Sequence, residues 1–218
     1  MADRLLFSKT GRAKYISHLD LMRTFQRAFA RAGIQIKHTE GFHPHPFVSI
    51  ALPLPVGFSS ECEALEFGLA GGAAPEEVPG RMNAVLPEGI AVQRCGGAVM
   101  FAKDLSYVNY IVTMEYEDGA PFGAETAIRE LLSRESLTAT KRSKSGEREV
   151  DIIPCIARSL CVEQRDAVIL DLTVRAKDPG LNPELVTAAI RRECPGLTPD
   201  YLSYHRKAVL NEKLEPWL

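Results

Sequence analysis

The chain has 218 residues, with 26 Lys and Arg against 28 Asp and Glu, and it is 45% hydrophobic and 25% charged. This composition is typical of a globular protein and excludes a disordered chain, a fibrous repeat and a disulfide-stapled miniprotein. No apolar run approaches the ~18–20 residues that cross a bilayer, and the N-terminus has no hydrophobic leader segment, so we expect a cytoplasmic protein that does not enter a membrane.

Positive charge is concentrated in the first part of the chain. Residues 1–50 contain eight Lys and Arg against three acidic residues, together with four of the five histidines. Residues 51–100 instead contain two basic and six acidic residues. An anionic partner is therefore expected to meet N-terminal surface.

The first half of the chain predicts the element order βαββαβ. A helix begins after Ser17, a good N-cap with Asp20 three residues on, and it stops at Gly33. Its apolar face includes Phe25 and Phe29. The other elements of this order are strands at Arg4–Lys9, Ile34–His38, Glu63–Leu69 and Ile90–Cys95, and a second helix from Pro75 to Leu86. The proline-rich loop between the second and third strands has room for one additional short strand, Phe47–Ala51.

The second half repeats strands and helices in a similar order. The alternation in Ala167–Arg175 is the strongest strand signal, and it predicts a hairpin with Arg158–Gln164. Further strands are predicted at Tyr107–Tyr116, Leu137–Arg142, Glu149–Ile153 and Leu197–Arg206, with helices at Phe122–Arg134 and Asn182–Glu193. The predicted fold class is α+β, with tandem ferredoxin-like units, 1–100 and 101–218, whose antiparallel sheets are covered by helices.

Three arginines, Arg23, Arg27 and Arg31, recur at every fourth position of the first helix. Like charges at this spacing repel by a few tenths of a kcal/mol per pair, and no acid is evident at matching spacing. The pattern favours contact with a phosphate backbone, although a solvated helix face also explains it. The residues predicted to bind nucleic acid are Lys9, Arg12, Lys14, Arg23, Arg27, Arg31, Lys37, Lys141 and Arg142.

The segment Gly41-Phe42-His43-Pro44-His45-Pro46, here named the His/Pro loop, is the densest group of special residues. The prolines stiffen the backbone, and imidazoles two residues apart point the same way in an extended chain. Such a loop is suited to ligand binding or to acid–base work completed by His18, Asp20 or Cys62, although its rings can equally serve only to shape it. The candidate catalytic residues are His18, Asp20 and His45; without a third ligand at fixed spacing, no metal is predicted.

Five cysteines form an odd number without a CxxC pair: Cys62, Cys95, Cys155, Cys161 and Cys194. Buried free thiols in a reducing compartment explain them better than disulfides or a closed zinc site. No close group of three cysteines is present, so the chain is not expected to hold the usual kind of iron–sulfur cluster by itself. Phosphate-binding glycine loops and aromatic base-stacking strand motifs are also missing from the sequence.

The stretches FSKTGRAKYISHLDLMRTFQRAFARAGI and GFHPHPFVSIALPLPVG, with EVDIIPCI further on, resemble the radical SAM-linked protein family, a bacterial family known as domain of unknown function 2344. Its members are typically encoded beside, or fused to, a radical SAM protein. The resemblance implies a partner that carries S-adenosylmethionine and an iron–sulfur cluster, with no cofactor in this chain. Where the family often has Phe-Asn-Pro-His-Pro, this chain has Phe42-His43-Pro44-His45-Pro46, so His43 replaces the usual Asn. This departure favours His45 over His43 as the catalytic candidate.

These observations together predict an accessory, substrate-binding partner of a separately encoded radical SAM enzyme, acting in RNA modification. Independent catalytic activity is not expected. Two alternatives remain at this point: an enzyme with a His/Asp site, with or without a metal, at the His/Pro loop, or a scaffold that binds the radical SAM protein through its apolar segment Leu52–Val56.

Overall fold

The computed structural model describes residues 3–97, 100–143 and 146–217, except for the side chains of Arg142 and Ser143. These residues form two compact units. The first comprises the chain up to Asp104 together with Trp217, and the second comprises Leu105–Pro216. Among the helices described, none combines the length and the apolar character that crossing a membrane requires.

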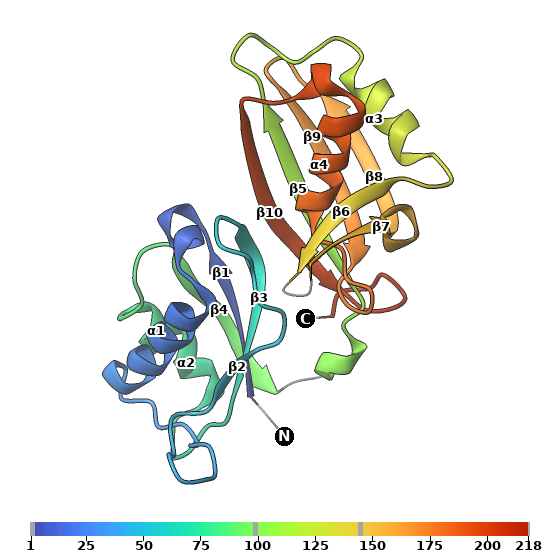
Figure 1. Ribbon diagram of the computed structural model, residues 1–218. Coiled ribbons are helices and arrows are strands. Elements are labelled where there is room, and N and C mark those ends of the chain that lie inside the picture. Colours follow the sequence, from blue (N-terminus) through green and yellow to red (C-terminus); the bar gives the residue numbers. More distant parts are fainter. Residues whose placement is uncertain (1–2, 98–99, 144–145, 218) are drawn as a thin grey trace. The chain divides into compact units, whose positions relative to one another are not determined.

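The first unit contains an antiparallel sheet in the strand order β4-β1-β3, with the short strand β2 paired to β3. Helices α1 and α2 cover one face of this sheet (Figure 1). The elements are β1 (Asp3–Lys9), a 3-10 turn (Gly11–Tyr15), α1 (His18–Arg31), β2 (Val48–Ile50), β3 (Ser59–Phe67), a 3-10 turn (Pro75–Glu77), α2 (Val78–Asn83) and β4 (Ile90–Gly97).

Aromatic side chains join α1 to the sheet of the first unit. The rings of Phe7 on β1 and Phe25 on α1 meet edge to face, with centroids 4.7 Å apart. Phe29 packs on Phe67 of β3 in a tilted arrangement at 4.9 Å. All four rings are buried, and each contributes about 1.5–3 kcal/mol by leaving water. This core fixes which face of α1 remains outside.

Both ends of α1 are capped as its sequence suggests. The Ser17 hydroxyl oxygen accepts a hydrogen bond from the Asp20 amide at 3.2 Å. At the other end, Gly33 has a φ of +65°, a left-handed conformation that favours glycine. Arg81 of α2 donates to the carbonyls of Ala32 and Gly33, and this ties the two helices together.

The second unit has an antiparallel sheet in the strand order β10-β5-β9-β8 and a separate hairpin, β6-β7. Its core combines alternate residues of β5 and β9, such as Val112 paired with Leu170, with Ile128 and Ile190 from the helices. The elements are β5 (Tyr107–Glu115), α3 (Ala124–Leu132), β6 (Thr138–Ser143), β7 (Gly146–Asp151), β8 (Ile156–Glu163), β9 (Ala167–Arg175), α4 (Pro183–Glu193) and β10 (Tyr201–Leu210).

The structure confirms a mixed α+β fold with mostly antiparallel strands and few helices. The predicted helix after Ser17 and the strand Ala167–Arg175 are present at the expected residues. The predicted strand at Ile34–His38 is wrong. That segment forms only isolated bridges, Ile36 to Leu69 and His38 to Pro46, and proline has no N–H with which to extend a ladder.

Candidate nucleic-acid interface

Helix α1 exposes a row of guanidinium groups. Leu21, Phe25 and Phe29 are buried in the core, whereas Arg23, Arg27 and Arg31 are exposed. Residues four apart are neighbours along a helix, so the arginines form one stripe, named here the arginine row. Arg31 donates to the Val85 carbonyl at 2.9 Å.

Asp20 lies at the start of the arginine row and partly neutralises it. Its Oδ1 accepts from Arg23 Nη1 at 3.2 Å, and its Oδ2 accepts from the Ser17 hydroxyl at 2.7 Å. These hydrogen bonds, that of Ser17 first, lower the pKa of Asp20 below its ordinary 3.8. The interpretation that the row has no acid at matching spacing is therefore wrong, because Asp20 stands three residues before Arg23. Asp20 acts here as a helix-end carboxylate and ion-pair partner.

Lys9 does not belong to this surface, contrary to the sequence prediction. It is 1% exposed, and its Nζ donates to the carbonyls of Lys14 at 3.2 Å and Ile16 at 2.9 Å. The sequence carried a signal for this placement, because strand alternation puts Lys9 on the same face as the buried Leu5 and Phe7. Its ammonium holds the turn that precedes α1 and cannot reach a ligand.

The turn before α1 adds exposed cations and an aromatic ring. Arg12 is exposed, and Lys14 is partly exposed with its Nζ 5.1 Å from the centroid of Tyr15. Tyr15 is 64% exposed, and the sequence analysis did not single it out. The grouping of Arg12, Lys14 and Tyr15 within four residues is the signal that could have found it, since cations beside exposed aromatics suit single-stranded nucleic acid. Lys37 is also exposed.

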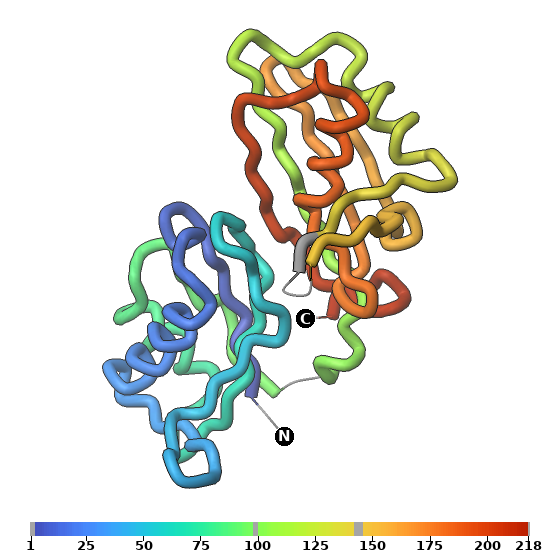
Figure 2. The backbone as a smooth tube through the Cα atoms, in the orientation of Figure 1, coloured from blue at the N-terminus to red at the C-terminus, as the bar shows by residue number. Residues whose placement is uncertain are grey.

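Thr39 closes the His/Pro loop, the light-blue turn between α1 and β2 in Figure 2. Its amide donates to the His45 carbonyl at 2.8 Å, and its hydroxyl oxygen accepts from the His45 amide at 3.2 Å. Nδ1 of His45 lies 3.1 Å from both the Thr39 hydroxyl and the His43 carbonyl. These contacts show that His45 shapes the loop. Phe42 is fully exposed near its tip, and Gly41 has a φ of +130°.

A groove lies where Pro46 of the His/Pro loop meets α1. Gln26 on α1 donates from Nε2 to the Pro46 carbonyl at 3.0 Å, which fixes the loop against the helix. Beside this contact lies an open cavity of about 480 Å³. Its lining comprises Gln26, Phe29, Ala30, Ile34, Gln35, Ile36, His38, Pro46 and Ala70. The groove therefore combines apolar walls with His38, and the arginine row runs along the same helix.

The described contacts do not assemble His18, Asp20 and His45 into one site. The loop touches α1 at Gln26, which is eight residues, or about 12 Å of helix, from His18. Nδ1 of His18 is buried without a hydrogen-bond partner in the described part of the chain. No acid–base step follows from this arrangement.

Cysteine and metal chemistry find little support in the described residues. Within residues 3–97, 100–143 and 146–217, no three His, Cys, Asp or Glu side chains are grouped so that they could hold a metal ion. All five cysteines are free thiols. Burial raises the pKa of Cys95 and of Cys161 to about 11, so both remain protonated and weakly nucleophilic near neutral pH.

The predicted basic segment of the second unit lies on the β6-β7 hairpin. Lys141 is partly buried and lines a cavity of this unit. Arg142 belongs to β6, but its side chain lies outside the described part of the structure. The apolar segment Leu52–Val56 belongs to the first unit, with Leu54 buried and Val56 exposed.

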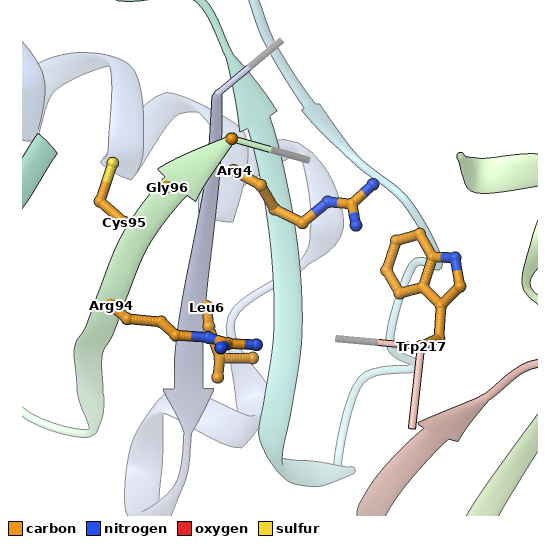
Figure 3. A pocket seen from close by; sticks show the side chains of 7 residues that line it. Arg4, Leu6, Arg94, Cys95, Gly96 and Trp217 are labelled. Atoms are coloured by element: carbon orange, nitrogen blue, oxygen red, sulfur yellow. The ribbon is translucent and has the colours of Figure 1, made fainter. Parts of the chain in front are cut away.

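A smaller cavity of about 170 Å³ adjoins Trp217 in the first unit. Figure 3 shows Arg4 directed at the Trp217 ring, while Arg94 lies beside Leu6. Arg4 Nη2 contacts Glu66 Oε1 at 2.8 Å and donates to the Met100 carbonyl at 2.7 Å. Arg4 is therefore a structural cation whose charge Glu66 balances. Sequence reasoning missed this group because its members are far apart along the chain.

The geometry defines an α+β protein with an exposed basic helix beside a rigid, grooved loop. Residues 4–183 match the family described as an uncharacterized protein conserved in bacteria (DUF2344), and the chain belongs to this family. No curated protein matches the sequence.

Solved structures that match this chain include the following two. One, the crystal structure of a Cbf5-Nop10-Gar1 complex, matches with 10% identity and a TM-score of 0.53, covering 95% of this chain and 48% of that chain. The present chain thus spans about half the length of that relative, and the likeness concerns the fold alone. The other, an unknown protein from Galdieria sulphuraria, has 11% identity and a TM-score of 0.29, covering 94% of this chain and 97% of that one.

Proposed function

We propose that this chain is a cytoplasmic RNA-binding accessory protein that presents an RNA substrate to a separately encoded radical SAM enzyme. The observation that carries the proposal is the exposed arginine row on α1, next to the groove and the His/Pro loop. In this proposal the chain has no independent catalytic activity, and S-adenosylmethionine and the iron–sulfur cluster belong to the partner.

Charge and exposure support RNA as the ligand. Arg27 faces solvent on the helix, and Arg23 is also exposed while its Nη1 contacts Asp20, so guanidinium N–H groups are available for phosphates at fixed spacing. Tyr15 and Phe42 are exposed aromatic rings on segments that flank this helix. Such rings stack on unpaired bases without sequence preference, so single-stranded RNA fits this surface best.

The radical SAM partner is supported by the family resemblance of FSKTGRAKYISHLDLMRTFQRAFARAGI and GFHPHPFVSIALPLPVG. Members of that family occur beside, or fused to, radical SAM proteins. An accessory chain adjacent to such an enzyme needs a substrate-binding surface and no cluster of its own. The scattered free cysteines fit this division of work.

We also propose that each of the two units described above is ferredoxin-like, as the sequence predicts in tandem for residues 1–100 and 101–218. The strand order β4-β1-β3-β2 of the first unit supports this assignment, since a split βαβ motif has the same order of elements. The second unit repeats the order as β10-β5-β9-β8, with the β6-β7 hairpin inserted after α3. This fold hosts many functions, so the RNA proposal depends on the surface and not on the fold.

The test is capture of RNA by the untagged protein from native lysate, with and without nuclease, followed by sequencing and mass spectrometry. The variant Arg23→Glu/Arg27→Glu reverses two charges of the arginine row. Arg158→Glu/Arg165→Glu is a matched control, because it makes the same change at exposed positions of the second unit. We expect a discrete RNA class that the first variant loses and the control retains.

Equal RNA capture by wild type and the arginine-row variant would contradict the proposal. A radical SAM protein that survives nuclease while no RNA is enriched would instead favour a scaffold that uses the segment containing Val56. Circular dichroism of both variants shows whether α1 is intact before either result is interpreted.

A further inference from the structure

Two cations stand directly opposite each other on the β6-β7 hairpin of the second unit. Lys141 and Arg148 are Cα partners in its antiparallel register, so their side chains share one face. Within the described residues, neither side chain has a hydrogen bond or an ion pair. Like charges in this position repel, and the described chain offers no acid that bonds to them. The pair is therefore suited to receive an anionic group.

The cation pair lies at the edge of a mostly apolar cavity. Lys141 and Arg148 both line this cavity, which has a volume of about 260 Å³. Val150 of β7, Ile152 just after β7, Leu181 just before α4 and Leu185 of α4 contribute apolar wall. Pockets for whole drug-sized ligands usually start at about 300 Å³, so this space takes one flat ring system, and any sugar and phosphate attached to the ring would lie outside it, toward the two cations.

Asp151 also lines the cavity, and its carboxylate is a hydrogen-bond acceptor. Asp151 Oδ1 accepts from the amides of Leu137 and Ile153, both at 3.1 Å. These hydrogen bonds, that of Leu137 first, lower the pKa of Asp151, so its carboxylate remains charged at neutral pH. The Ser136 side chain also hydrogen-bonds to this carboxyl group. Asp151 is exposed, and its carboxylate oxygens can each accept more than one hydrogen bond, so it can still accept from an N–H donor.

We propose that this cavity binds a nucleotide, with the phosphate between Lys141 and Arg148 and the base against the apolar wall. The three parts of the lining each select this chemistry. A paired cation site favours a phosphate. The apolar wall favours a ligand with an apolar part, which free phosphate lacks. Asp151 disfavours a plain acyl chain but accepts a hydrogen bond from an N–H group, which every base carries. The nucleotide can be free or part of an RNA strand.

This site lies in the second unit and does not use the arginine row of α1. The test is isothermal titration calorimetry of the full chain with four probes: inorganic phosphate, CMP, AMP and a four-nucleotide single-stranded RNA. We expect at least one nucleotide probe to bind at concentrations below about 1 mM. Stronger binding of the tetranucleotide than of CMP and AMP would assign the site to a strand, and the reverse order would assign it to a free nucleotide.

Arg148→Glu is the main variant, because it removes one cation of the pair at an exposed position. We expect it to weaken nucleotide binding at least about tenfold, since a charge-assisted hydrogen bond is lost. Arg158→Glu makes the same charge change at an exposed position of β8 outside the cavity and should change affinity less than about twofold. Leu185→Trp fills the cavity while both cations remain, and it should weaken nucleotide binding without affecting phosphate.

Three results would overturn the assignment. They are no binding of any probe, equal loss of affinity in Arg148→Glu and Arg158→Glu, and phosphate binding as tight as that of the best nucleotide. Arg23→Glu/Arg27→Glu separates this site from the proposed RNA surface. That variant should keep nucleotide binding even if the RNA proposal fails, and Arg148→Glu should keep the RNA contacts of the first unit.

Discussion

The guanidinium carbon of Arg4 lies 3.9 Å from the centroid of the Trp217 ring. Both residues are buried, Arg4 at 8% and Trp217 at 2% exposure. The indole Nε1 of Trp217 also donates to the Phe101 carbonyl at 2.9 Å. Trp217 is thus bound to β1 through the cation–π contact and to the segment after β4 through the hydrogen bond, and both interactions are strengthened by the exclusion of water.

Replacing Trp217 with alanine should destabilise the protein strongly. Loss of a buried indole typically costs about 3–5 kcal/mol, and Arg4 also loses its stacking partner. Urea unfolding followed by circular dichroism measures the change in unfolding free energy. Trp217→Phe keeps an aromatic face for Arg4 and should lose clearly less. An unchanged midpoint in Trp217→Ala would show that the contact contributes nothing to stability.

Phe42 at the tip of the His/Pro loop should contribute to RNA affinity without contributing to stability. It is fully exposed, so Phe42→Ala leaves no cavity. Stacking on a base is worth about 1–3 kcal/mol, which corresponds to a loss of at least about fivefold in affinity. Fluorescence anisotropy with the captured RNA measures it. Phe122→Ala, at an equally exposed ring of the second unit, is the control and should bind as wild type does.

Asp20→Asn distinguishes an ion-pair role from a catalytic one. Asp20 holds Arg23, so its neutral variant should release that guanidinium and tighten RNA binding by a few-fold. The Ser17 cap still accepts the amide of residue 20, and α1 should remain folded. Binding assays on wild type and variant show whether RNA affinity rises, as expected, or falls. Abolished activity of the partner system with unchanged RNA affinity would restore Asp20 as a catalytic candidate.

The thiols of Cys95 and Cys161 make stability depend on alkaline pH. Burial raises their folded-state pKa to about 11 from the ordinary 9.0, so the unfolded chain ionises first as pH rises. Their stabilising contribution is complete below pH 9.0 and is lost as pH approaches 11. Urea midpoints of wild type should fall more steeply over this range than those of Cys95→Ala/Cys161→Ala. Parallel pH curves would contradict the assignment.

Local patterns predicted much of the fold. Ser17 and Gly33 mark the ends of α1 because their side-chain and backbone chemistry acts within a few residues. The alternation in Ala167–Arg175 predicts where β9 begins and ends, because the residues on each face of that strand have similar surroundings along its length. The predicted strand at Ile34–His38 was wrong because the pairing of this segment depends on Leu69 and Pro46, and strand propensity alone does not reveal such partners.

The surface was harder to predict than the fold. Exposure of Arg23, Arg27 and Arg31 follows from the helical period, and the structure places them outside as expected. Lys9 was misplaced because buried lysine is rare, and the carbonyls that hold it come from a turn whose path the sequence does not show. The cavity beside Lys141 and Arg148 needs β7, α4 and the segment between them, which only tertiary structure brings together.

Because Trp217 belongs to the first unit, it affects both how that unit folds during synthesis and where the chain can be cut into fragments. Along the chain, the second unit is an insertion between two parts of the first. During synthesis, residues 105–216 must therefore leave the ribosome before Arg4 of β1 can contact the Trp217 ring. A fragment cut after Asp104 carries the arginine row and the His/Pro loop but lacks this last contact, so its weakened fold would be mistaken for weak ligand binding.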